Sequence, residues 1–395
     1  MNSHPSRQRP GIFGRPVLTV AIVLAVLAAV GVGSVAFANR DSGKPAASWA
    51  EPTGSTPAPP ASSSSRAPVE ESATDVGTVT LSATGDIMMS NAPGRMPPAD
   101  GAGFFDSVKK ALASDLVMGN LEQPLTTDTG TSKCGAAATN CFAFRSPPSY
   151  AKHLRDGGFD LVNTANNHSK DFGTQGARNT REALDEVGVK ATGNTDEITV
   201  VEVKGIKVAV VGFSSYAGAN SLLDLDQARS VVEQAKEQGD LVVVQVHMGA
   251  EGSDEQHVKP GTETFFGENR GDPMKFSRVV IDAGADLVVG HGPHVLRGME
   301  FYKGKLIAYS LGNFAGGGRT LSRTGVLKYG GVLHVTLRKD GSYVGGKLLS
   351  TYMNSDGLPT RDESAERGRK LVAQLTKADF PETGPTFGAD GSIEP

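Results

Sequence analysis

The chain has 395 residues and a formal net charge of −4, with 38% hydrophobic and 6% aromatic residues. This length suffices for one large domain or two ordinary ones, and the lean apolar content predicts that part of the chain is disordered. The nearly balanced charge supplies no basic field, so nucleic acid is excluded as an expected partner.

The N-terminal segment predicts membrane anchoring or export. Residues 1–16 are basic, and the apolar run at residues 17–38 contains no charged side chain. This run is long enough to span a bilayer as a helix, and the positive charge before it favours a cytoplasmic N-terminus. The run ends in AFA, which resembles a signal-peptide cleavage site, so a secreted form is the alternative to a single-pass anchor in the cell membrane. In both forms we expect the remaining chain outside the cytoplasm.

Composition divides the remaining chain into three parts. Residues 39–76 are rich in Pro, Ser and Ala and predict a disordered linker, because such a composition cannot bury a core. Residues 77–353 carry the apolar patterns of one globular domain. Residues 354–395 are polar, and we expect a tail with one helix near residues 365–378 and a disordered end.

The globular part alternates apolar strands with amphipathic helices. We expect strands at residues 76–86, 115–120, 159–166, 197–215 (a pair), 240–247, 285–291, 305–314 and 330–353 (a hairpin). We expect helices at residues 104–114, 149–158, 174–189, 226–239 and 272–284. This alternation predicts an α/β fold built in layers.

Two cysteines, Cys134 and Cys141, flank a short loop of small residues. In an exported chain such a close pair predicts a disulfide, and two free thiols or a weak metal pair are the alternatives. The spacing matches no usual zinc pattern, and no histidine lies near the pair in the sequence.

Residue types that bind metals follow several of the predicted strands. They are Asp86, Glu122, Asn167, His168, His247, His291 and His294. Strand ends in an α/β sheet open into the crevice where ligands bind, so we expect these side chains to converge. Carboxylate, carboxamide and imidazole groups together can hold divalent ions, and His168 can act as a general acid. Taken singly each has a structural interpretation, because Asp86 could cap a helix and Asn167 could occupy a turn.

The ordered motifs resemble a known family. GDIMM, GNLEQPL, TANNHSKDFG, QVHMGAE, GHGPHVLRGME and YSLGNF occur in the order typical of the CapA (poly-γ-glutamate capsule biosynthesis) family. The domain of that family is similar to the calcineurin-like metallophosphoesterases, and the resemblance covers roughly residues 79–349. It implies a metallophosphoesterase-like four-layer β-sandwich flanked by helices.

The resemblance also implies roles for the site residues. The implied metal ligands are Asp86, Glu122, Asn167, His247, His291 and His294. Glu122 would bridge two ions, and His168 would be the catalytic acid. The resemblance therefore implies one or two divalent ions per chain, and manganese, iron and zinc all suit these ligand types.

The sequence departs from the metallophosphoesterase pattern at Met88, where a histidine is usual. Methionine is a poor ligand for hard divalent ions, so the site beside Asp86 would lose an imidazole, and Glu251 is a candidate to complete it. Asp171 could orient a histidine or cap the helix that follows it. Arg319, after three glycines, could hold an anionic substrate or lie in a mobile loop.

These inferences predict a membrane-tethered, extracytoplasmic, metal-dependent hydrolase. The resemblance implies that it acts in synthesis, export or processing of an anionic cell-envelope polymer such as poly-γ-glutamate, with membrane synthetase subunits as partners. One alternative is a non-catalytic scaffold or polymer-binding subunit of a capsule synthetase, which Met88 favours. A second is a secreted phosphodiesterase. The chain has no GxSxG elbow and no Walker phosphate loop, so a serine hydrolase or an ATP-driven ligase lacks support.

Overall fold

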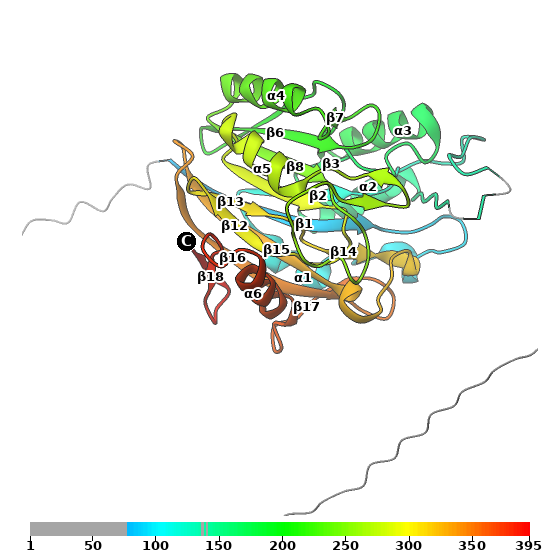
Figure 1. The fold of residues 1–395 in the computed structure, drawn as a ribbon. Helices are drawn as coiled ribbons and strands as arrows, with labels where there is room; N and C mark the ends of the chain where they lie inside the picture. The colour runs from blue at the N-terminus through cyan, green and yellow to red at the C-terminus, as the bar shows by residue number, and fades with distance from the viewer. Residues whose placement is uncertain (1–76, 136–137, 140) are drawn as a thin grey trace, which may run out of the picture. The chain divides into compact units, whose positions relative to one another are not determined.

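The computed structural model describes residues 77–135, 138–139 and 141–395 (Figure 1). The predicted basic segment, anchor and linker at residues 1–76 lie outside the described residues. Within the described part, no helix combines the length and the apolar character that a membrane crossing requires. The fold is α/β with two mixed sheets.

The larger sheet has ten strands, and its main path runs β18-β19-β16-β15-β1-β2-β3-β4, with β14 beside β1 and β17 beside β16. The strands are β1 (Thr78–Met88), β2 (Leu116–Leu121), β3 (Leu161–Asn163), β4 (Lys190–Thr192), β14 (Asn313–Gly316), β15 (Tyr329–Arg338), β16 (Tyr343–Met353), β17 (Pro359–Arg361), β18 (Thr386–Phe387) and β19 (Ser392–Glu394). β1 is central, because it pairs in parallel with β2 and β14 and antiparallel with β15. The expected hairpin at residues 330–353 is the β15–β16 pair.

The second sheet has seven strands in the order β12-β13-β11-β8-β6-β5, with β7 beside β6. They are β5 (Thr199–Val203), β6 (Ile206–Ser214), β7 (Asn220–Ser221), β8 (Leu241–His247), β11 (Leu287–His291), β12 (Met299–Tyr302) and β13 (Lys305–Ala308). β6, β8, β11 and β13 run parallel, which explains their nearly continuous apolar sequences. A small hairpin, β9 (Thr264–Phe265) with β10 (Glu268–Asn269), projects from the loop before α5.

Apolar side chains of the two sheets meet in one core. Leu81 and Met118 of the larger sheet share this core with Val243 and Val289 of the second sheet. All four are buried, because alternate residues of each strand point to the opposite face. The two sheets therefore pack face to face.

Helices cover the other faces of the sheets, as Figure 1 shows. The α-helices are α1 (Asp106–Leu112), α2 (Ala151–Gly157), α3 (Gly173–Glu186), α4 (Leu225–Gln238), α5 (Pro273–Asp282) and α6 (Arg367–Asp379). Leu112 and Leu184 of α1 and α3 pack on the larger sheet, and Val232 and Val280 of α4 and α5 pack on the second. Their apolar residues recur at helical spacing, which predicted these helices from the sequence.

One expected strand, at residues 305–314, is wrong. The segment forms β13 in the second sheet and β14 in the larger sheet, separated by residues 309–312. Gly312 adopts φ +65°, and a Cβ there would lie 2.6 Å from the Tyr329 carbonyl oxygen. A glycine is therefore required where the chain passes from one sheet to the other.

The C-terminal segment is folded, contrary to the expected polar tail with a disordered end. Its helix α6 begins at Arg367, close to the expected start, but β17 and β19 also pair with β16. Ile393 lies in the core shared by the sheets, and the Phe380 ring stacks on Tyr309 at 5.1 Å. Residues 354–395 thus complete one edge of the larger sheet.

Candidate metal centre

The candidate ligands lie close together at the ends of strands from both sheets. β8 and β11 pair in parallel with His247 opposite His291, and both strands end there. β1 pairs with β2 so that Asp86 lies opposite Asn120, and Glu122 follows the end of β2 directly. Parallel strands end at a common edge, so side chains distant in sequence converge as expected.

The strand that carries Asp86 extends further than expected. β1 continues to Met88 because Asp86 and Ile87 pair with β14, with a bulge between the two residues. Such a bulge re-aims a side chain without ending the strand. Met88 itself is buried in the protein interior, and the cluster described below forms without it.

Three side chains form a compact group of potential metal ligands: Asp86, Glu122 and His294. One ligand atom from each lies within 4.8 Å of the others, and within the described residues no second such group of His, Cys, Asp and Glu is present. His294 Nδ1 lies 3.2 Å from Asp86 Oδ2, and His294 Nε2 lies 3.5 Å from Glu122 Oε1. His294 adopts φ +60°, a backbone conformation that is uncommon for non-glycine residues.

Burial and mutual electrostatic interactions determine the charge states of Asp86, Glu122 and His294. Burial raises the pKa of the Glu122 carboxyl well above its usual value, and Asp86 and Glu251 add to this rise. Burial acts to lower the pKa of His294, but Glu122 and Asp86 outweigh it, so the pKa is raised well above its usual value. Burial raises the pKa of Asp86, but its contacts with His294 and Asn120 lower it overall. In the metal-free protein His294 is therefore protonated among carboxylates, and a metal ion ligated by its Nε2 would take the place of that proton.

A further expected ligand, His247, also lies beside Glu122. His247 Nε2 lies 3.8 Å from Glu122 Oε1, and both Glu122 oxygens are buried without a hydrogen-bond partner. Asn167 Oδ1 and His291 Nδ1 are buried and unpaired as well. An unpaired buried polar atom costs roughly 1–3 kcal/mol, so this concentration of free lone pairs is the pattern expected of metal ligands.

The two strand-end histidines are neutral. Burial lowers the pKa of His247 well below its usual value, and Arg270 adds to this effect. Burial also lowers the pKa of His291 to about 4. Neutral imidazole is the form that ligates metals, so both residues fit a divalent ion.

His168 is held by an acidic partner rather than by the metal-ligand group. Its Nδ1 lies 2.8 Å from Asp171 Oδ2, and Asp171 Oδ1 forms a 2.6 Å ion pair with Lys133. Burial lowers the pKa of His168 despite the contact with Asp171. Asp171 does not cap α3, whose N-cap residue, Phe172, makes no side-chain capping bond. Of the two interpretations of Asp171, the geometry therefore agrees with the orientation of His168.

Several polar residues at the site were not among the sequence candidates. Asn120 Nδ2 donates to Asp86 Oδ1 at 2.8 Å, and Asn120 Oδ1 accepts from both Asn163 and Asn166. Asn313 Oδ1 lies 2.8 Å from His294 Nδ1. These buried amides fix the ligand side chains, as outer contacts of metal ligands commonly do. Asn120 and Asn313 do occur in the motifs GNLEQPL and YSLGNF, which was the available signal.

Arg270 is the unexpected residue at this site. It is fully buried, its Nη1 lies 2.6 Å from Glu251 Oε1, and its Nη2 lies 3.0 Å from His247 Nε2. Glu251 Oε2 also lies 3.7 Å from His294 Nε2, so this carboxylate reaches the first ligand group as expected. No sequence motif includes Arg270, which arrives from the loop before α5.

A cleft of about 450 Å³ opens beside these residues. Asn167, His168 and Arg270 line it, and Phe142 and Phe266 stand at its sides with exposed fractions of 61% and 76%. Within the described residues only four large apolar side chains are exposed, and two of them line this cleft. Exposed aromatic rings beside polar groups are typical of a binding site.

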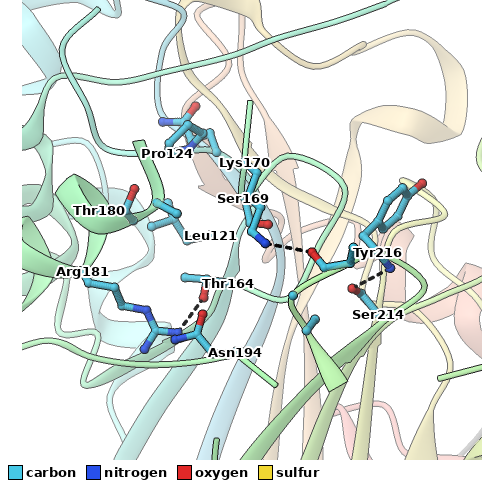
Figure 2. A pocket seen from close by; sticks show the side chains of 16 residues that line it. Leu121, Pro124, Thr164, Ser169, Lys170, Thr180, Arg181, Asn194, Ser214 and Tyr216 are labelled. Carbon is cyan, nitrogen blue, oxygen red and sulfur yellow. Dashed lines mark hydrogen bonds between the residues drawn. The ribbon is translucent and has the colours of Figure 1, made fainter. Parts of the chain in front are cut away.

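A second cavity, drawn in Figure 2, is too small for a substrate. It holds about 40 Å³, enough for a few water molecules. The cations around it are already satisfied, because Arg181 bonds Thr164 Oγ1 and Lys170 bonds the Ala217 carbonyl. Tyr216 lines both this cavity and the larger cleft.

Two candidates from the sequence lie elsewhere. Arg319 lines a different open cleft with Arg95 and Asp356, and it is not among the residues around His168. Cys134 and Cys141 form a disulfide, directly before Phe142. Cys141 itself lines the cleft beside Phe142.

Comparisons with known proteins identify the family. The model of the family "Bacterial capsule synthesis protein PGA_cap" matches residues 80–317, which is more than half of the chain. The chain belongs to this family. The match includes Asp86, Glu122, His168, His247 and His294, so the resemblance inferred from the motifs is confirmed.

Curated relatives agree with the family assignment. The chain is 30% identical over 322 residues to the PGA biosynthesis protein CapA of Bacillus subtilis, covering 76% of this chain and 78% of the relative. It is 29% identical over 327 residues to the capsule biosynthesis protein CapA of Bacillus anthracis, covering 76% and 73%. The similarity in each case extends beyond the residues of the family model.

Among solved structures, the chain is similar to a 5'-nucleotidase precursor from Thermus thermophilus. The TM-score is 0.39 at 17% identity, over 76% of this chain and 59% of that chain. A similar match, with a TM-score of 0.37, is the NAD nucleotidase of Haemophilus influenzae. Both likenesses concern the fold.

Proposed function

We propose that this chain is a membrane-tethered, metal-dependent hydrolase that acts outside the cytoplasm. Its role would be the synthesis, export or processing of an anionic envelope polymer such as poly-γ-glutamate, in contact with membrane synthetase subunits. The family assignment supports the biological role, and the apolar run at residues 17–38 supports the tether. Its two facing sheets with outer helices fit the four-layer metallophosphoesterase arrangement.

One observation carries the enzymatic part of the proposal. Glu122 is a fully buried carboxylate with no hydrogen-bond partner, and it lies between His294 and His247. His294 compensates the charge of Glu122 without a hydrogen bond to either oxygen, an arrangement that leaves both oxygens free to ligate an ion. A divalent ion ligated by Asp86, Glu122 and His294 would supply an activated water and polarise the bond to be cleaved.

The chain's own residues would do the remaining work. His168 lines the cleft, and Asp171 holds its Nδ1, so Nε2 is the atom available to exchange a proton with the leaving group. Lys133 forms an ion pair with Asp171 at 2.6 Å and compensates its buried charge. The phenyl rings of Phe142 and Phe266 would exclude water from one side of the bound substrate.

A direct assay tests this function. Full-length protein in detergent would be incubated with Mn²⁺, Fe²⁺ or Zn²⁺ and with either poly-γ-glutamate or bis(p-nitrophenyl) phosphate. We expect metal-dependent turnover that EDTA abolishes and His168→Ala reduces. Metal binding without turnover of either substrate would overturn the hydrolase proposal.

A non-catalytic polymer-binding subunit is the second candidate, and one observation favours it. Met88, buried in β1, stands where metallophosphoesterases supply a further histidine ligand. Poly-γ-glutamate binding that is equal in wild type and in His168→Ala, without polymer shortening, would support this alternative.

A further inference from the structure

Arg270 is fixed at the site by its backbone as well as by its side chain. Its N–H donates to the Glu263 carbonyl at 2.9 Å, and its carbonyl accepts from the N–H of Gly249 at 2.9 Å. Gly249 lies two residues after His247, so these bonds tie the Arg270 loop to the end of β8. The guanidinium is therefore placed beside His247 by the fold.

The Arg270 side chain contacts Nε2 of His247, the same atom that faces Glu122. His247 Nε2 lies 3.8 Å from Glu122 Oε1 and 3.0 Å from Arg270 Nη2. Because arginine only donates, Nε2 must supply its lone pair to the guanidinium. An imidazole nitrogen has one lone pair, so His247 Nε2 cannot bind Arg270 and a metal ion at the same time.

Neighbouring residues hold the Arg270 guanidinium in contact with His247. Glu251 Oε1 holds the other guanidinium nitrogen at 2.6 Å, and the Tyr216 ring lies under the guanidinium at 5.7 Å. Gly292 leaves the necessary space, because a Cβ there would lie 3.0 Å from both Arg270 Nη2 and His247 Nε2. Arginine does not lose its proton in proteins, so its charge also stays beside this position.

The site has two halves, namely His247 with its neighbours and the group Asp86, Glu122 and His294. They differ in whether an arginine contacts a ligand atom. The other ligand atoms around His247, namely Asn167 Oδ1, His291 Nδ1 and the Glu122 oxygens, are unpaired. In the Asp86, Glu122 and His294 group, no arginine or lysine contacts a ligand atom among the described residues. Only the His247 half is contacted by a cation that cannot lose its proton, since the imidazole of His294 can give up its proton to an incoming ion.

We propose that Arg270 makes the site asymmetric, so that one divalent ion binds tightly at Asp86, Glu122 and His294 and a second binds weakly at His247. The second ion must break the bond between Arg270 and His247 and lie close to a fixed positive charge. A hydrogen bond of a charged group of this strength corresponds to about a 10- to 100-fold loss in affinity. The inference rests on the proposed metal site but not on turnover.

Equilibrium dialysis of full-length protein against Mn²⁺, with metal counted by mass spectrometry, tests the proposal. For wild type we expect one tightly bound ion per chain and a second ion bound at least about tenfold more weakly. In Arg270→Met we expect the second affinity to rise by about 10- to 100-fold and the first to stay unchanged. Arg297→Met is the matched control, because Arg297 is also fully buried and anchors the same loops through Glu263.

A double variant separates Arg270 from its acidic partner. Arg270→Met leaves Glu251 unpaired, and a free carboxylate could itself bind an ion. If the second affinity rises equally in Arg270→Met with Glu251→Gln, the competition at His247 is supported. If the rise disappears in the double variant, or also occurs in Arg297→Met, the proposal is overturned.

If Arg270→Met does not fold, the metal binding of the wild-type protein alone still tests the proposal. Two ions of equal affinity in wild type would overturn the role of Arg270 while leaving the proposed metal-dependent function intact. No bound ion at saturating Mn²⁺ would overturn both.

Discussion

Glu122 Oε1 and His294 Nε2 face each other at 3.5 Å, and neither Glu122 oxygen has a hydrogen-bond partner. The buried carboxylate and the buried imidazole therefore depend on each other for charge compensation. The raised pKa of Glu122 reflects the desolvation of its carboxyl, and the raised pKa of His294 reflects the attraction of the surrounding carboxylates.

We expect Glu122→Gln to lower both stability and metal binding. In EDTA the variant should be less stable than wild type by roughly 3–5 kcal/mol, because it leaves the buried His294 without its compensating charge. The same variant should lose its bound metal. Urea unfolding in EDTA and metal analysis would measure both effects, and a Glu122→Gln protein that keeps wild-type stability and its metal would contradict this account.

We expect His168→Ala to lower kcat by about 100-fold or more without changing metal content, because His168 contacts Asp171 and Lys133 rather than the ligand group. Asp171→Asn should lower kcat less and should retain the metal, because it changes only the orientation of the ring. Steady-state kinetics with metal analysis would check both variants. Loss of the metal in His168→Ala would contradict the separate role of this residue.

We expect the aromatic walls of the cleft to contribute to substrate affinity. Replacing Phe142 and Phe266 by Ser should raise KM for an aryl phosphodiester by about 5- to 10-fold and leave kcat nearly unchanged, because the rings bury apolar surface against substrate. Leu223→Ser is the matched control, since Leu223 is 43% exposed and lines a different cleft. An equal change in the control would refute a specific role of the rings.

We expect the C-terminal segment to be required for stability. Ile393→Ala should cost about 2–4 kcal/mol, because Ile393 is buried in the core between the sheets. Glu394→Ala, an exposed neighbour in β19, should be nearly neutral. Urea unfolding would measure both, and a neutral Ile393→Ala would mean that the segment does not pack as described.

We expect His334 to contribute to the loss of stability at acidic pH. Burial lowers its pKa below the usual 6.5, and its Nε2 contacts the Ala111 carbonyl at 2.7 Å. The unfolded state then binds the proton more readily, so stability is lost as pH falls below about 6.5. Between about pH 7.5 and pH 5.5, His334→Gln should lose less urea resistance than wild type, and an equal loss would exclude the contribution.

Local sequence patterns predicted much of this fold. The apolar runs of β8 and β11 and the helical spacing in α4 and α5 depend on neighbours in sequence, and the structure places these elements as expected. The division of residues 305–314 into β13 and β14 was not predictable in this way, because it depends on which sheet each half pairs with. The strand β19 was missed for the same reason, since its pairing with β16 is non-local, whereas β17 pairs with β16 as a short local hairpin in a polar segment.

The candidate site shows a similar division. Strand ends and ordered motifs predicted Asp86, Glu122 and His294, which the structure brings together. Arg270 could not be predicted, because a single arginine in a loop has no pattern and its position depends on backbone bonds to Gly249 and Glu263. Arg319 was a candidate only because it follows glycines, and that local feature places it in another cleft.

The central claim is that Asp86, Glu122 and His294 hold a divalent metal ion. Anomalous diffraction at the zinc edge from a crystal of the protein grown with Zn²⁺ would test it most directly. We expect a strong peak about 2.0–2.2 Å from a carboxylate oxygen of Asp86, a carboxylate oxygen of Glu122 and Nε2 of His294. A zinc-saturated crystal with no peak between these three side chains would contradict it.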